Sequence, residues 1–243
     1  MNKNYVFIII TYVVTLFSVF IGVPLLYKLG VGQDVSLEML PMYLSSIWTV
    51  LSFSIGLVII LLLVWRTKST NTIDVAEKMS FSGSTIWAIL GIFLAFFAQM
   101  AAVLVENIIG VEPGSENTQE IMNLIRSFPM IIIITTLIGP ILEEIVFRKV
   151  IFGTLFNRFS FHVSAVVSSV IFAIAHRDYV HLILYTAMGI TFSYLYMKTN
   201  RIIVPIISHV AMNAIVVIIQ LNFVDGEVPI TSTILKLVGG LIQ

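Results

Sequence analysis

Long apolar runs, repeated along almost the whole chain, are the feature that most limits how this sequence can fold. Seven runs are near the length of a membrane span, and they cover residues 5–26, 42–65, 85–109, 129–157, 162–177, 180–198 and 202–221. A helix needs about 20 mostly apolar residues to cross a bilayer. We therefore expect an all-α, polytopic transmembrane helix bundle of seven to eight spans, in which residues 230–241 would supply a partial or interfacial eighth helix.

The composition excludes several other classes of protein. Hydrophobic residues make up 58% of the 243 residues and charged residues only 11%, whereas soluble domains carry about a quarter charged residues. We expect a single membrane-embedded domain over residues 1–243, with the lipid bilayer as its surroundings. The formal net charge is zero, which argues against nucleic acid as a partner, and the absence of cysteine excludes disulfides and thiolate chemistry.

Basic residues near the ends of the runs predict how the chain is oriented. If the spans alternate, most of them fall on one side, and the opposite side collects most of the acidic residues. The residues on the basic side are Lys3, Arg66, Lys68, Lys78, Arg158, Lys198 and Arg201. Basic residues favour the cytoplasmic side. We expect a multi-pass membrane protein with a cytoplasmic N-terminus, and we interpret residues 5–26 as a retained span rather than a signal peptide.

Glu143 and Glu144 stand side by side in the most apolar half of the chain. An ionisable group near the centre of a membrane helix costs roughly 2.5–3.5 kcal/mol on insertion scales, so it needs a partner or a function. Glu144 precedes Arg148 by four residues, the spacing at which an ion pair closes along a helix. Glu143 has no such partner, and a carboxylate left over in an apolar site suits proton transfer. On a helix the two acids point about 100° apart, so we expect them to have separate tasks.

Two histidines and an asparagine occupy later apolar runs. His176 ends its run, and the four-residue spacing of His209 and Asn213 puts both on one helical face, directed at the same neighbour. We interpret His162 and His181 as interfacial residues instead. Counting helical rise places His176 nearer the opposite face from Glu143 and His209. Convergence would therefore need a later or broken helix, or a strongly tilted fourth span.

Two chemistries suit this set of residues. In the first, Glu143 is a general base that activates water with His176, while His209 and Asn213 donate hydrogen bonds to an oxyanion. In the second, Glu143, His176 and His209 bind Zn²⁺, which lowers the pKa of a bound water. We rank metal-independent water activation slightly ahead, because the sequence lacks His-Glu-x-x-His. Either route predicts amide hydrolysis within the membrane.

The spacing within three motifs resembles the signature of the CPBP family, which comprises type II CAAX prenyl endopeptidases and bacteriocin-processing (Abi) membrane proteins. The motifs are Glu143-Glu144-x-x-x-Arg148, Phe172-x-x-x-His176 and His209-x-x-x-Asn213. The resemblance covers residues 129–221, the expected catalytic core, and is strongest to small bacterial membrane peptidases. It implies that Glu143 and His176 activate water, that His209 and Asn213 stabilise the oxyanion, and that Glu144, Arg148 and Phe172 support the site.

The resemblance also implies a substrate class, a peptide or small membrane protein such as a leader or signalling-peptide precursor. It does not fix the metal requirement. Two other functions compete with an intramembrane peptidase. The first is a noncatalytic scaffold or regulator of the same family, which the presence of all the motif residues disfavours. The second is a proton-coupled transporter, which the absence of an internal repeat disfavours.

Overall fold

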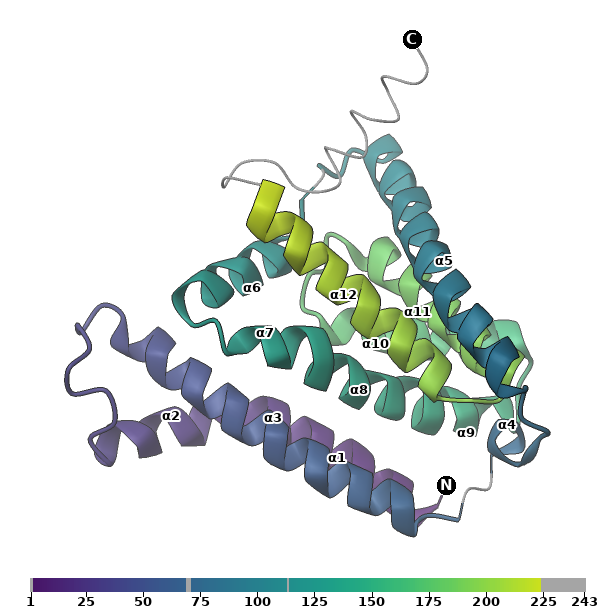
Figure 1. The fold of residues 1–243 in the computed structure, drawn as a ribbon, viewed down its shortest axis with the longest axis horizontal. Helices are drawn as coiled ribbons and strands as arrows, with labels where there is room; N and C mark the ends of the chain where they lie inside the picture. The colour runs from purple at the N-terminus through teal and green to yellow at the C-terminus, as the bar shows by residue number, and fades with distance from the viewer. Residues whose placement is uncertain (1, 69–70, 113, 224–243) are drawn as a thin grey trace.

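The computed structural model describes residues 2–68, 71–112 and 114–223, and the described residues form helices and connectors without a strand (Figure 1). The N-terminal half contains α1 (Lys3–Phe17), α2 (Val19–Lys28), α3 (Leu40–Arg66), α4 (Thr72–Val75) and α5 (Phe81–Ile108). The second half contains α6 (Glu116–Ser127), α7 (Ile131–Ile133), η1 (Ile134–Ile138), α8 (Gly139–Glu143), η2 (Glu144–Phe152), α9 (Gly153–Phe156), α10 (Phe161–Ala175), α11 (Leu182–Thr199) and α12 (Ile203–Phe223). The expected helix at 230–241 lies outside the described residues.

Three of the described helices are long and apolar enough to cross a membrane, namely Leu40–Arg66, Phe81–Ile108 and Ile203–Asn222. The first predicted span is divided into α1 and α2, which meet at an angle of 48° and could together form a fourth. The described residues thus confirm the all-α fold class and include helices suited to span a membrane, while the expected number of seven to eight spans is not confirmed. The predicted runs at 162–177 and 180–198 correspond to the shorter helices α10 and α11.

The predicted span at 129–157 is a helical stretch that changes its hydrogen-bonding pattern several times. Two segments within it, η1 and η2, are π-helical, with N–H groups that bond to carbonyls five residues earlier instead of four. This stretch lies in the middle of the bundle (Figure 1). It contacts α1 and α3 on one side, and α10, α11 and α12 on the other. Any side chain that it directs inward therefore meets residues from distant parts of the sequence.

Helix α6 was not predicted from the sequence. It begins inside the polar connector at 110–120, and Ser115 caps its N-terminus by accepting a hydrogen bond from the Thr118 N–H. Its Met122 and Ile125 are buried and pack with Val217 of α12. Because α6 is amphipathic, a search for continuous apolar runs misses it.

Close helix crossings depend on glycine next to a polar side chain. A Cβ on Gly91 of α5 would lie 2.3 Å from the hydroxyl oxygen of Ser208 on α12. A Cβ on Gly189 of α11 would lie 2.6 Å from the Cβ of Ser169 on α10. Small residues at such crossings let two helices approach closely, which is how membrane helices gain packing energy without a hydrophobic driving force. The hydroxyl of Ser208 also donates to the Ala88 carbonyl, 2.8 Å away.

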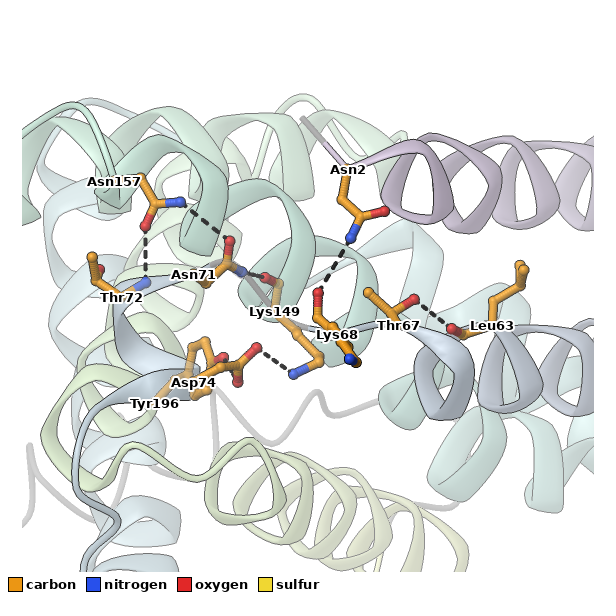
Figure 2. Close-up of polar contacts among 10 residues, drawn as sticks. All are labelled: Asn2, Leu63, Thr67, Lys68, Asn71, Thr72, Asp74, Lys149, Asn157 and Tyr196. Atoms are coloured by element: carbon orange, nitrogen blue, oxygen red, sulfur yellow. Dashed lines mark hydrogen bonds and ion pairs between the residues drawn. The ribbon is translucent and has the colours of Figure 1, made fainter.

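The short helix α4 fastens the connector between α3 and α5 to the middle of the bundle (Figure 2). Asn71 donates from its side-chain nitrogen to the carbonyl of Lys149, 2.6 Å away. The Asp74 carboxylate accepts from the Lys149 ammonium and from the Tyr196 hydroxyl, each at 2.5 Å. Lys149 belongs to η2 and Tyr196 to α11, so one acidic side chain ties the connector to two packed helical segments.

Substituting Asp74 tests this attachment. Asp74→Ala removes the acceptor of both groups and leaves the Lys149 ammonium largely buried without its partner. We expect a loss of about 1–3 kcal/mol of stability, the typical cost of an unsatisfied buried polar group. It is measured as a lower melting temperature in detergent. Glu77→Ala is the control, since Glu77 is an exposed acid of the same connector. Equal melting temperatures for the two variants would contradict the assignment.

Candidate active site

Glu144 is the buried acid of the pair. It is fully buried, and its Oε2 lies 3.3 Å from the Arg148 Nε, which confirms the predicted ion pair. The guanidinium of Arg148 lies over the ring of Phe172, 4.1 Å from its centroid, and 5.4 Å from the centroid of Phe192. A cation over an aromatic face is attracted by the ring quadrupole, and more so in a dry environment. Phe172 therefore contacts Arg148, and its supporting role in the site stays a prediction.

His209 of α12 lies between the two acids. Its Nδ1 is 2.8 Å from the Glu144 Oε1, and its Nε2 is 3.8 Å from the Glu143 Oε2. A carboxylate is an acceptor, so Nδ1 carries the hydrogen and Nε2 is the nitrogen that faces Glu143. The ring of Phe192 stacks on the imidazole at 4.7 Å. The two acids differ in burial and in their other partners, but both contact the same imidazole.

Glu143 is the accessible acid. Its side chain is 19% exposed, whereas that of His209 is 2% exposed. The contact between them, at 3.8 Å, is an ion-pair distance rather than a direct hydrogen bond. Glu143 therefore combines an apolar setting with free carboxylate capacity, as the sequence predicted.

His176 follows the last residue of α10, and its ring orientation is fixed from two sides. Its Nδ1 is 2.8 Å from the Phe172 carbonyl, so that nitrogen donates and Nε2 is left as an acceptor. The Tyr185 ring stacks on the imidazole with the centroids 4.2 Å apart. His176 interacts electrostatically with Glu143 and His209, so the structure brings these groups into one region.

The expected difference in depth between His176 and Glu143 is wrong, although α10 does begin at Phe161. The two residues are nearly equidistant along the chain from the connector at 157–160, and α10 packs against η2. The hydroxyl of Ser168 donates to the Phe147 carbonyl, which fixes the relative level of the two helices. Glu143 and His176 can therefore lie at a similar level although α10 is unbroken from Phe161 to Ala175.

Asn213 lies one turn beyond His209 on α12 and faces the same central stretch. Its side-chain nitrogen donates to the carbonyl of Thr135 in η1, 3.1 Å away. The prediction that His209 and Asn213 are directed at one neighbour is confirmed, since both contact the stretch at 131–156.

The alternative ligand set for zinc fits less well. Among the described residues, no group of three or more His, Cys, Asp or Glu side chains is arranged to hold a metal ion. The Nδ1–H groups of His176 and His209 donate to the Phe172 carbonyl and the Glu144 carboxylate, which leaves only Nε2 of each ring for a ligand. Because the described residues contain no group of ligands at metal-binding distances, no reaction step is assigned to a metal.

A second polar cluster lies beside the site, and the sequence analysis missed it. His181, which was interpreted as interfacial, is buried within the protein in the connector between α10 and α11. Its Nδ1 contacts the Glu106 carboxylate and its Nε2 the Gly114 carbonyl, each at 2.8 Å. Nearby, the Tyr185 hydroxyl bonds to Ser115, 3.1 Å away. His162, by contrast, is exposed.

Two acceptors around one imidazole favour its charged form. Burial alone would lower the pKa of His181, but the hydrogen bonds to Glu106 and Gly114 and the charges of Asp178 and Glu106 raise that pKa above its ordinary value of 6.5. A raised pKa in the folded state means that protonated His181 stabilises the fold. That contribution is fully present below about pH 6.5 and is lost as the pH rises through the folded-state pKa.

The melting temperature should therefore decline as the pH rises above 6.5, because His181 loses a proton that both of its acceptors require. The measurement is thermal unfolding in detergent between about pH 6 and pH 9. His181→Gln should flatten the decline, while His162→Gln, at an exposed histidine of α10, should preserve it. A decline of the same size in His181→Gln would contradict this assignment.

The two neighbouring acids should differ sharply in their effect on stability. Glu144→Ala leaves the buried Arg148 guanidinium without its ion-pair partner, which typically costs about 3–5 kcal/mol. Glu143→Ala removes a partly exposed carboxylate and should cost much less. The yield of monodisperse protein and its melting temperature measure the difference. Similar losses in both variants would refute the division of roles.

Comparison with known proteins places these residues in a family. The model described as "Type II CAAX prenyl endopeptidase Rce1-like" matches residues 125–215. The chain is 45% identical to "Putative membrane peptidase YdiL" of Bacillus subtilis (strain 168), over 99% of both chains. It is 38% identical to "Membrane-embedded CAAX protease MroQ" of Staphylococcus aureus (strain USA300), over 70% of this chain and 71% of that protein. No solved structure matches the chain.

The matched region contains the two acids, both site histidines and Asn213, which are the groups that the fold brings together. The similarity to the Bacillus protein extends over almost the whole length, so it includes the helices that surround this region. Together with the apolar, membrane-length helices, these matches identify an integral membrane protein. The chain belongs to the Rce1-like family of type II CAAX prenyl endopeptidases.

Proposed function

We propose that this protein is an intramembrane endopeptidase that hydrolyses a peptide bond in a membrane-associated peptide or small membrane protein. The single observation that carries the proposal is the placement of Glu143. It is a partly exposed carboxylate whose Oε2 lies 3.8 Å from His209 Nε2. His176 interacts electrostatically with both of these residues. Such a group can take a proton from water, and its neighbours can stabilise the charge that develops.

His176 is suited to orient the water and share its proton. Its Nδ1–H is donated to the Phe172 carbonyl, so Nε2 presents a lone pair. The Tyr185 ring keeps the imidazole from rotating. In the proposed reaction the water oxygen bonds to the carbonyl carbon of the substrate, and the proton of the water passes to Glu143 with the help of His176.

His209 and Asn213 are suited to stabilise the oxyanion. Glu144 accepts the Nδ1–H of His209, which leaves Nε2 to donate when the ring carries both protons. Two carboxylates, one guanidinium and one imidazolium then give the buried cluster no net charge, which limits the cost of desolvation. Asn213 keeps a second N–H beyond the one that it donates to Thr135. The tetrahedral intermediate collapses as the C–N bond breaks, and the proton held by Glu143 goes to the departing amine.

The surroundings and substrate follow from the composition and the relatives. The bias of Lys and Arg supports a cytoplasmic N-terminus, and the two bacterial relatives support a bacterial cell membrane. One relative is named a membrane peptidase and the other a CAAX protease. We propose that the substrate is a precursor peptide held in or near the bilayer, such as a leader or signalling peptide.

Substitutions at the two water-activating residues test the proposal. Glu143→Ala and His176→Ala should each lower peptide cleavage by purified, reconstituted protein by about 10²–10⁴-fold, the usual contribution of general acid–base catalysis. Both variants should remain folded. The matched control is His162→Ala, an exposed histidine on the same helix as Phe172, which should retain activity.

Full cleavage activity in both Glu143→Ala and His176→Ala would rule out this mechanism. A noncatalytic scaffold of the same family makes a different prediction in cells. If the protein is a scaffold, the alanine variants should fully complement a deletion strain. If it is an enzyme, the Glu143→Ala variant should fail to complement it.

A further inference from the structure

The Gly139–Pro140 pair lies where the helical stretch before the acids changes its hydrogen-bonding pattern. In η1 the N–H of Gly139 donates to the carbonyl of Ile134, five residues earlier. A Cβ at position 139 would lie 2.9 Å from that same carbonyl oxygen, closer than real Cβ atoms approach. Short π-helical segments of this kind often occur at functional sites. Glycine at 139 therefore permits the π turn. The next carbonyl along this turn is that of Thr135, and its hydrogen-bond donor must be identified.

The Thr135 carbonyl would continue this pattern by accepting from the nitrogen of residue 140. That residue is proline, which has no backbone N–H. The hydroxyl of Thr135 cannot serve its own carbonyl, because it donates to the Ile131 carbonyl, 3.1 Å away. Backbone carbonyls in a protein interior are almost always paired, since an orphaned one costs free energy. Pro140 thus leaves an acceptor that needs a donor from elsewhere.

Asn213 of α12 supplies that donor. Its Nδ2 lies 3.1 Å from the Thr135 carbonyl oxygen, although the two residues are far apart in the sequence. A carbonyl can only accept, so the nitrogen of the amide must face Thr135 and its oxygen must face elsewhere. This one contact decides which way the amide is turned. The second N–H of Asn213 then has a fixed direction.

We infer that Pro140 is a positioning residue for Asn213, acting by leaving the Thr135 carbonyl to the Asn213 amide. The inference rests on the proposed function, in which the second N–H of Asn213 donates to the oxyanion. Pro140 itself contacts no reacting atom in this scheme. Pro140 belongs to the same helix as Glu143. One helical turn would therefore determine the position of the Glu143 carboxylate and, through Thr135, the orientation of the Asn213 amide.

Pro140→Ala tests the inference through kinetics. Alanine restores a backbone N–H that can donate to Thr135 and compete with the Asn213 amide. We expect kcat to fall about tenfold or more, because a misplaced oxyanion donor loses much of its effect. KM should change less than about twofold. The melting temperature should stay equal or rise, since an interior proline weakens a helix.

The matched control is Pro24→Ala, which makes the same change inside α2 at an exposed proline outside the site. It should leave kcat unchanged. Unchanged kcat in Pro140→Ala, with an active wild-type chain, would overturn the inference. So would a parallel loss of activity and melting temperature, because that result would assign Pro140 a purely structural role.

A double-mutant cycle of melting temperatures tests the hydrogen bond between Asn213 and Thr135 independently of catalysis. In the wild-type background, Asn213→Ala deprives the Thr135 carbonyl of its donor and should lower the melting temperature by several degrees. In the Pro140→Ala background the new N–H replaces that donor, so Asn213→Ala should lower the melting temperature less. Equal losses in both backgrounds would overturn the inference. An inactive wild-type chain would instead overturn the proposed function, and the cycle would still report whether Pro140 places the amide.

Discussion

A buried carboxylate that contacts both a guanidinium and an imidazole is the interaction on which the site depends. Glu144 is fully buried and contacts both Arg148 of its own segment and His209 of α12. A charge in an apolar interior is tolerated only when it is paired and hydrogen-bonded. Glu144 therefore needs both partners, and its contact with His209 in turn holds α12 in register with the central stretch. His209 is in turn held with one chosen nitrogen facing Glu143.

The irregular helix at 131–156 accounts for the rest of the geometry. A regular α-helix would satisfy its own carbonyls and direct them along its axis. Here the two π-helical segments and Pro140 alter that pattern next to the acids, and a side chain from another helix bonds to the Thr135 carbonyl. The same stretch is held at its far end by Asn71, which reaches the Lys149 carbonyl (Figure 2). Backbone groups of a central helix thus take part in tertiary contacts.

Local spacing was enough to predict part of the site. The ion pair of Glu144 and Arg148, and the shared face of His209 and Asn213, follow from helical periodicity and are confirmed. Contacts between residues distant in sequence, such as the buried pair of Glu106 and His181, have no local signature. The π turns were not predicted either, because an apolar run indicates that a segment lies in lipid or in the protein interior. It does not indicate whether each N–H bonds to the carbonyl four or five residues earlier. The number of spans is not confirmed for a related reason, since an apolar helix inside a bundle resembles one that crosses a bilayer.

The crossing of α5 and α12 gives the site a dependence on a helix that contributes no functional side chain to it. Gly91 faces Ser208, the residue immediately before His209, and a Cβ there would lie 2.3 Å from the serine hydroxyl oxygen. Any larger residue at 91 must displace the Ser208 and Leu195 side chains, and Ser208 adjoins His209 in the chain. The geometry of the candidate site therefore depends partly on the smallest residue of a helix that lies outside it.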